Sequence, residues 1–250
     1  MWIAEVIHRL GVGGFRASRC PAQAGVVRTP RLWPLPDQPA TRAMLRHAGI
    51  SDAMIRTQLA AGRLLVVRHG VFLAASAWPG EPGPQHLVRA RAELLTNPAA
   101  VLSHQSAATQ WRLSHPGFEN WWDQPVAITL SAEGHSSRGR GAIHHVGDLP
   151  EAQVSRTPEG CPVTSPARTA VDLAANLPLP ESLVLFDAAA RVIVASLLAN
   201  PRRRDYSNPA MIAACRDMLR SATAGRRLGR PPSPWWNRLG NRHRNPCPRA

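Results

Sequence analysis

Residues 51–74 (SDAMIRTQLAAGRLLVVRHGVFLA) change from a helical to a strand pattern at Gly62, and this change limits the folds open to the chain. Before the glycine, Ile55 and Leu59 are four residues apart, the spacing that places two side chains on one face of a helix. After it, two short apolar runs flank residues 68–70 (Arg-His-Gly), a composition typical of a hairpin turn. The sequence therefore predicts a short helix that leads directly into a β-hairpin.

A second helix is predicted just before this segment. Residues 40–49 (ATRAMLRHAG) have helical spacing and end at Gly49, a residue type that often stops a helix. Ser51 is then a suitable N-cap for the next helix, because its hydroxyl can accept a hydrogen bond from an N–H of the first turn. The strands of the hairpin are expected at residues 64–67 and 71–74. Helix, turn, helix and hairpin in this order predict a winged helix-turn-helix over residues 40–76.

The positive charge of the chain is concentrated in two places. The formal net charge is +14, and all thirty basic residues are arginine. Residues 201–250 carry twelve arginines against two aspartates, and residues 40–74 carry five arginines against Asp52, while the two signs balance elsewhere. A local net charge of +4 inside a predicted winged helix indicates a nucleic-acid partner better than the overall charge does.

Candidate DNA contacts come from this basic segment. Its arginines can bind phosphates, and Arg56 and Thr57, which point away from the predicted core, can reach base edges. The candidate residues are Arg42, Arg46, Ser51, Arg56, Thr57, Arg63, Arg68 and His69. An ordinary solvated surface is the alternative interpretation of the same residues. If the protein forms a symmetric homodimer, inverted repeats are expected in its double-stranded DNA site.

The following residues predict a second domain of mixed α/β structure over residues 85–200, after a linker at 78–84 (WPGEPGP). Helical spacing or capping signals occur at residues 86–96, 103–111, 165–175 and 181–200, and strands are expected at 125–130 and 142–146. The expected fold class is therefore α/β (α+β), with a winged helix followed by a mixed domain.

Both ends of the chain are expected to be disordered. Residues 1–39 contain five prolines and little periodicity, so they are expected as a poorly ordered extension. Residues 201–250 are expected as a basic, mostly disordered tail, with one possible helix at residues 211–222.

Three motifs in order resemble the AbiEi family of type IV antitoxins, the antitoxin and transcriptional regulator of abortive-infection systems. They are LAAGRLLVVRHGVFLA (59–74), AVLSHQSAATQWRL (100–113) and CPVTSPARTAVDLA (161–174). The resemblance implies a regulator that binds its own promoter, with no enzymatic activity and no cofactor. It implies a nucleotidyltransferase-like toxin as an indirect partner, because type IV antitoxins act without a stable toxin complex. The family-motif residues of the second domain are Ser103, His104, Ser106, Arg168 and Asp172.

The chain departs from relatives that continue into a Vsr-like endonuclease domain. Residues 201–250 contain only Asp205 and Asp217 as acidic residues, too few for a metal-dependent nuclease centre there. We therefore carry over DNA binding and antitoxin-like regulation, and not nuclease activity. Two alternatives stay open: a truncated or degenerate member of the endonuclease-fused group, and a protein-interaction module.

Other polar residues favour structural roles, and no catalytic or metal-binding residue is expected. Ser103 as an N-cap, with His104 in the first turn, explains that pair more simply than a nucleophile and its base. His144 and His145 are strand neighbours that point to opposite faces, so they are poorly placed to bind one metal ion. Arg168 and Asp172 are spaced to form an intrahelical ion pair.

The cysteine pattern and the hydropathy indicate a cytoplasmic protein without a membrane partner. The four cysteines are scattered and form no Cys-x-x-Cys pair. The first residues lack the apolar stretch of a secretory leader, and no run reaches the ~18 apolar residues of a membrane helix.

Overall fold

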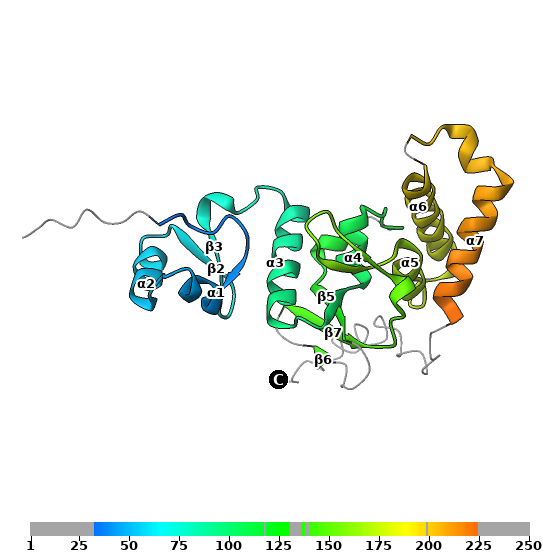
Figure 1. The fold of residues 1–250 in the computed structure, drawn as a ribbon. Helices are drawn as coiled ribbons and strands as arrows, with labels where there is room; N and C mark the ends of the chain where they lie inside the picture. Colours follow the sequence, from blue (N-terminus) through cyan, green and yellow to red (C-terminus); the bar gives the residue numbers. More distant parts are fainter. Residues whose placement is uncertain (1–32, 118, 131–136, 139–140, 199, 225–250) are drawn as a thin grey trace, which may run out of the picture. The chain divides into compact units, whose positions relative to one another are not determined.

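The computed structural model describes residues 33–117, 119–130, 137–138, 141–198 and 200–224 (Figure 1). It contains helices and two β-sheets, so the mixed α/β class predicted from the sequence is confirmed. The described residues from Leu35 onward belong to one compact unit, which holds both segments predicted as separate domains. Of the ends expected to be disordered (1–39 and 201–250), residues 1–32 and 225–250 lie outside the described residues.

Residues 35–77, here called the N-terminal module, combine two helices with a small antiparallel sheet (Figure 1). The helices are α1 (Arg42–His47) and α2 (Asp52–Ala60), and the strands are β1 (Ala40–Thr41), β2 (Leu64–Arg68) and β3 (Val71–Ala74) in the order β1-β3-β2. The predicted order of helix, turn, helix and hairpin is therefore present. Its interpretation as a DNA-binding winged helix stays a prediction.

The predicted caps and turns of this module explain where its helices begin and end. The Ser51 hydroxyl accepts a hydrogen bond from the N–H of Met54 at 3.3 Å, as expected of an N-cap. Gly49, Gly62 and Gly70 all have positive φ angles, between 66° and 82°, which residues with a Cβ rarely adopt. These glycines let the chain turn sharply after each helix and at the hairpin tip.

The core of the N-terminal module is small and centred on β3. All four residues of Val71–Ala74 are buried, and the strand lies between β1 and β2. Ile55 from α2 is 1% exposed, and Leu59 is partly buried beside it, as the helical spacing predicted. The start of the ordered fold lies before residue 40, since the carbonyl of Pro36 accepts a hydrogen bond from the N–H of Ala74.

Residues 82–224, here called the main module, are built around a six-stranded mixed sheet in the order β6-β7-β5-β4-β9-β8. The strands are β4 (Ala100–Leu102), β5 (Val126–Leu130), β6 (Ser137–Arg138), β7 (Ala142–Val146), β8 (Val154–Arg156) and β9 (Pro162–Thr164). The pairs β5–β7 and β4–β9 are parallel and the others are antiparallel. The predicted strands at 125–130 and 142–146 are therefore inner strands of this sheet.

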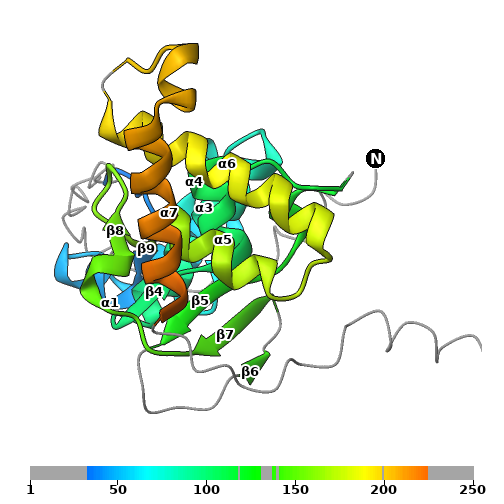
Figure 2. The same cartoon turned by 90° about the vertical axis from the view of Figure 1, so that its right-hand side faces the viewer.

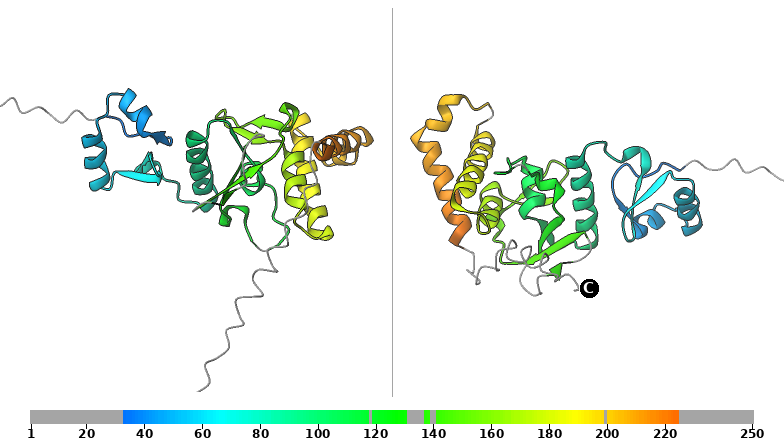
Figure 3. Two further views of the ribbon diagram at one scale, coloured as in Figure 1. Left: turned by 90° about the horizontal axis from the view of Figure 1, so that it is seen from below. Right: turned by 180° about the vertical axis from the view of Figure 1, so that it is seen from behind.

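Helices cover the sheet and extend outward from it (Figures 2 and 3). They are α3 (Pro82–Thr96), α4 (His104–Trp111), α5 (Pro166–Ala174) and α6 (Leu179–Leu197). Helices α3 and α4 contact β5, α5 contacts α4, and α6 contacts α5. Short 3-10 turns occur at Ala75–Ala77 (η1), Trp121–Asp123 (η2), Glu151–Gln153 (η3) and Arg203–Ser207 (η4). No helix in the described ranges is both long and apolar enough to cross a membrane.

Two predicted boundaries of the main module are corrected by the structure. The expected linker at 78–84 ends early, because α3 already begins at Pro82, a residue that fits the first turn of a helix. The expected tail from residue 201 is folded up to Ala224, where α7 (Pro209–Ala224) packs against α5 (Figure 2). Cys215 and Ala222 of α7 are 7% and 1% exposed, so this helix belongs to the core.

Candidate nucleic-acid interface and buried polar sites

The outer face of α2 is exposed and polar, as predicted. Arg56 and Thr57 are both exposed, one residue beyond the buried Ile55. The Thr57 hydroxyl donates a hydrogen bond to the carbonyl of Ala53 at 3.0 Å, which leaves its oxygen able to accept another. Ser51 caps the start of this helix, so the first turn of α2, which precedes Arg56 and Thr57, has a defined beginning.

Arg42 and Arg46 of α1 point toward the first turn of α2. Arg46 donates to Asp52 from Nε at 3.1 Å and also from Nη2, and Arg42 Nη1 lies 3.8 Å from the same carboxylate. The hydrogen bond from Arg46 lowers the pKa of Asp52 below its usual value, and the same bond raises the pKa of Arg46. These exposed pairs orient two arginines beside α2 and leave a net positive charge there.

Two further predicted residues lie on the exposed surface of the hairpin region. Arg63, just before β2, is exposed, while its N–H donates to the carbonyl of Gln58 at 3.0 Å and thereby ties the chain to α2. His69, at the tip between β2 and β3, is also exposed. This backbone hydrogen bond therefore holds Arg63 next to the end of α2.

The prediction that Arg68 contacts phosphate stays a prediction, and the structure shows that its guanidinium is engaged with α3. Arg68 Nη1 lies 2.9 Å from Oε1 of Glu93, and it also donates to the hydroxyl of Thr96. The Glu93 side chain is only 5% exposed and accepts a second contact from His144 Nε2 at 2.8 Å. A buried carboxylate without a cation is costly, so Glu93 holds Arg68 strongly. The sequence did not reveal this partner because it lies in the next module.

Ser103 stands at the N-cap position of α4, but its side chain does not cap the helix. Its hydroxyl is instead 3.0 Å from Nδ1 of His104, and the serine is fully buried. His104 has a positive φ of 47°, an unusual conformation for a residue with a side chain. Its ring stacks on that of His145, with the ring centroids 3.6 Å apart. The predicted capping role of Ser103 is therefore replaced by a contact with His104.

Ser106 connects α4 to α3 and to the large sheet. Its hydroxyl oxygen accepts a hydrogen bond from the N–H of Ala127 at 2.8 Å and lies 2.9 Å from Nε2 of His86. Burial lowers the pKa of His86 to about 4, because the charged imidazolium loses its hydration there. The neutral His86 was missed by sequence reasoning, since a single histidine inside a helical pattern carries no motif.

Arg168 and Asp172 form the predicted intrahelical pair inside the protein. Arg168 Nε lies 2.9 Å from Oδ2 of Asp172, and the two side chains are 5% and 4% exposed. The guanidinium also donates to the carbonyl of Asp148 at 3.0 Å and to the side chain of Gln153 at 2.5 Å. The Ser165 hydroxyl accepts from the N–H of Arg168 at 3.2 Å, so the predicted cap of α5 is confirmed. These contacts join α5 to the chain around β8.

The described residues contain no group of three or more potential metal ligands in one place. Cys161 and Cys215 are free thiols. Serine, histidine and acidic side chains are therefore used in pairwise contacts that link helices to the sheet.

Comparison with known proteins finds no family model and no curated protein that matches the chain.

Proposed function

We propose that this protein is a cytoplasmic, sequence-specific DNA-binding regulator that uses the exposed face of α2 to read double-stranded DNA. One observation carries the proposal: Arg56 and Thr57 are exposed on a helix that directly follows a tight turn and directly precedes a hairpin. A helix in this position can enter the major groove, where side chains at its N-terminal half reach base edges.

The charges around α2 support this proposal. In the part of the chain that the structure describes, Arg56 and Arg63 form no ion pair with a carboxylate, whereas Arg42 and Arg46 share Asp52. Exposed arginines without an acidic partner can bind phosphates at little cost in broken contacts. Arg68 is excluded from this set because Glu93 holds it.

The regulatory part of the proposal rests on the three sequence motifs. We propose an AbiEi-like antitoxin that represses its own operon and opposes a nucleotidyltransferase-like toxin indirectly. The motif at 161–174 corresponds to β9 and α5, and the motif at 100–113 corresponds to β4 and α4. Their polar residues contact the backbone or other side chains of the main module, which favours an architectural role for the motifs.

The proposal is tested by DNA binding to the region upstream of the protein's own gene, measured by fluorescence anisotropy at several salt concentrations. Arg56→Ala combined with Thr57→Ala is expected to weaken specific binding by about 2 kcal/mol and to lower the salt slope by roughly one, because one phosphate or base contact by arginine is lost. The same two proteins are also titrated with random-sequence DNA of the same length. A smaller loss of affinity on the random DNA shows that the lost contact is sequence-specific.

Two matched variants separate this interface from a general effect of charge. Arg63→Gln is expected to lower the salt slope like a phosphate contact, and Arg191→Gln, an exposed arginine on α6, is expected to leave it unchanged. Wild-type affinity in the Arg56→Ala/Thr57→Ala protein would remove α2 from the interface. No shift of any upstream DNA together with a stable co-purifying protein would support the interaction-module alternative instead.

A further inference from the structure

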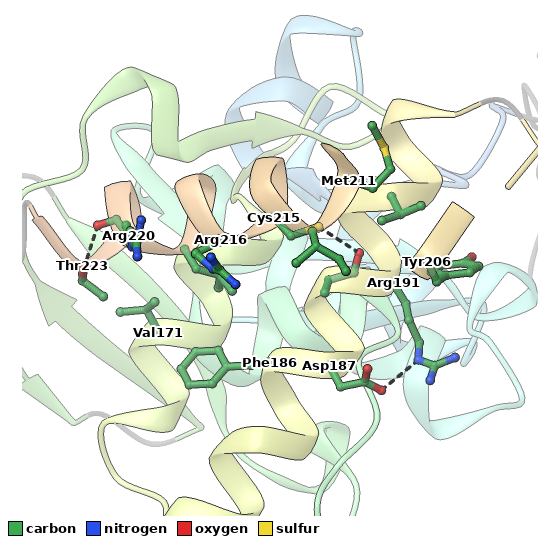
Figure 4. Close-up of a pocket in the computed structure, with 14 residues that line it drawn as sticks. Val171, Phe186, Asp187, Arg191, Tyr206, Met211, Cys215, Arg216, Arg220 and Thr223 are labelled. Carbon is green, nitrogen blue, oxygen red and sulfur yellow. Dashed lines mark hydrogen bonds and ion pairs between the residues drawn. The ribbon is translucent and has the colours of Figure 1, made fainter. Parts of the chain in front are cut away.

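A groove between α6 and α7 is apolar on its walls. It has a volume of about 540 Å³ and is lined by side chains from α5, α6, η4 and α7 (Figure 4). Phe186, Val194, Cys215 and Leu219 are among the apolar residues that form its sides. Small-molecule sites in proteins have volumes of roughly 300–1,000 Å³, so the groove has the size of a site for one small ligand.

The α7 side of the groove is held in place by the packing of this helix. Cys215 Sγ lies 3.8 Å from the carbonyl oxygen of Ala190, where the two helices meet. Burial raises the pKa of the Cys215 thiol, so it stays neutral and contributes an apolar surface. Ala222, near the C-terminal end of α7, is 1% exposed and packs into the core, so this end of the helix is also held in place.

The rim of the groove carries an excess of positive charge. Arg191 is paired with Asp187 at 2.9 Å and lies over the ring of Tyr206. Arg216 and Arg220 are four residues apart on α7 and line the same groove, above Phe186 in Figure 4. Within the described residues Arg216 has no ion pair, and Arg220 has only a contact of 3.8 Å to the exposed Asp217.

We propose that this groove binds an amphipathic monocarboxylate of the medium-chain fatty acid type. The hydrocarbon body would lie along Phe186 and Val194, and the carboxylate would meet the guanidinium groups of Arg216 and Arg220. Apolar walls with charged groups along the rim match such a ligand in both polarity and charge.

Charge complementarity selects this ligand over two other occupants. A second copy that docked symmetrically, groove to groove, would bring the same excess of arginines to the rim. The chain's own residues 225–250 include seven arginines and no acidic residue, so they would also add positive charge. A small carboxylate, in contrast to both of these occupants, brings a negative charge that neutralises the rim.

The test is calorimetric titration of the full chain with decanoate and with decyltrimethylammonium, below the concentrations at which they form micelles. The two ligands have the same hydrocarbon chain and opposite charge. Decanoate is expected to bind with one site and about tenfold more tightly than the cation, the effect of one charge-assisted hydrogen bond. Arg216→Gln is expected to weaken decanoate binding by about tenfold and to leave the cation unaffected or slightly tighter.

Arg204→Gln is the matched control, because Arg204 is an exposed arginine of η4 outside the groove. Unchanged decanoate binding in this variant supports the proposal. The proposal would be overturned if the two amphiphiles bound equally well or if neither showed saturable binding. It would also be overturned if Arg216→Gln and Arg204→Gln lost the same affinity for decanoate. A dimer in sedimentation that dissociates in Arg216→Gln, without decanoate binding, would assign the groove to a second copy.

Discussion

At the scale of single residues, the chain contains two Arg–Asp pairs that have the same spacing and different surroundings. Arg168–Asp172 and Asp187–Arg191 both have an Nε–Oδ2 distance of 2.9 Å. The first pair is about 5% exposed and the second is 66% exposed. Coulomb attraction and desolvation are both much larger in the interior, so the two pairs differ in what their loss costs.

We expect Asp172→Ala to lower the free energy of unfolding by about 3 kcal/mol, because Arg168 would remain buried with its charge only partly compensated. Asp187→Ala on α6 removes the same group from solvent-exposed surroundings and is expected to leave the unfolding midpoint close to that of the wild type. Urea denaturation of the three proteins measures both effects. Equal losses in the two variants would contradict the assignment of Arg168–Asp172 to the core.

At the scale of secondary-structure elements, the β2–β3 hairpin is linked to α3 by the Arg68–Glu93 ion pair. Glu93 also contacts His144 on β7, and its Oε1 accepts from the side chain of Asn97 at 3.1 Å. An arginine that neutralises a buried carboxylate is less available to a phosphate, because a shift toward DNA would weaken the contact with Glu93. The position of the hairpin charge is therefore set by the main module.

This link gives a prediction that rests on the proposed DNA binding. Glu93→Gln keeps the shape of the side chain and removes its charge, so Arg68 is released and the salt slope of DNA binding is expected to steepen by about one. Glu81→Gln, an exposed acidic residue just before α3, is the control with no expected effect. An unchanged slope in Glu93→Gln, while Arg56→Ala/Thr57→Ala weakens binding, would show that the hairpin stays away from DNA.

Elements with local signals were predictable, and those formed by distant partners were not. The helices α2 and α5 follow from a serine cap and from apolar spacing, and the β2–β3 hairpin follows from Gly70. In contrast, β4, β8 and β9 have three residues each, so they contain too few positions for a periodic pattern. The start of α3 was missed because Pro82 and Pro84 suggested a loop.

The candidate sites show the same limit. The exposure of Arg56 follows from helical periodicity, since it is adjacent to the buried Ile55. The partners of Arg68 and Ser106 lie on elements far away in sequence, and no local rule identifies Glu93 or His86 as their neighbours. Charge alone therefore located the basic segment, and the fold decided which of its arginines remain exposed.

At the scale of the whole molecule, the stability of the fold is expected to depend on pH through His86. Its pKa is about 4 in the folded protein, against the usual 6.5. The unfolded chain therefore binds a proton more readily, so stability is complete above about pH 6.5 and falls as the pH is lowered toward 4.

Urea denaturation at about pH 7 and about pH 4.5 measures this effect, and the loss from His86 between them is roughly 2–3 kcal/mol. His86→Leu removes this titration. The difference in free energy of unfolding by which the wild type exceeds this variant is therefore expected to be smaller at the lower pH by that amount. His47→Leu, an exposed histidine of α1, serves as the control. A gap between wild type and His86→Leu that is the same at both pH values would contradict a buried neutral His86.

The position of β4 in the large sheet also has a consequence for biosynthesis. Leu102 pairs with Ile128 on one side and with Val163 on the other. At about 10 residues per second, a ribosome adds the second partner several seconds after it adds β4. During that interval one edge of the nascent strand is unpaired. A chaperone that binds at the ribosome and shields this edge should therefore raise the yield of native protein more than a treatment applied after synthesis.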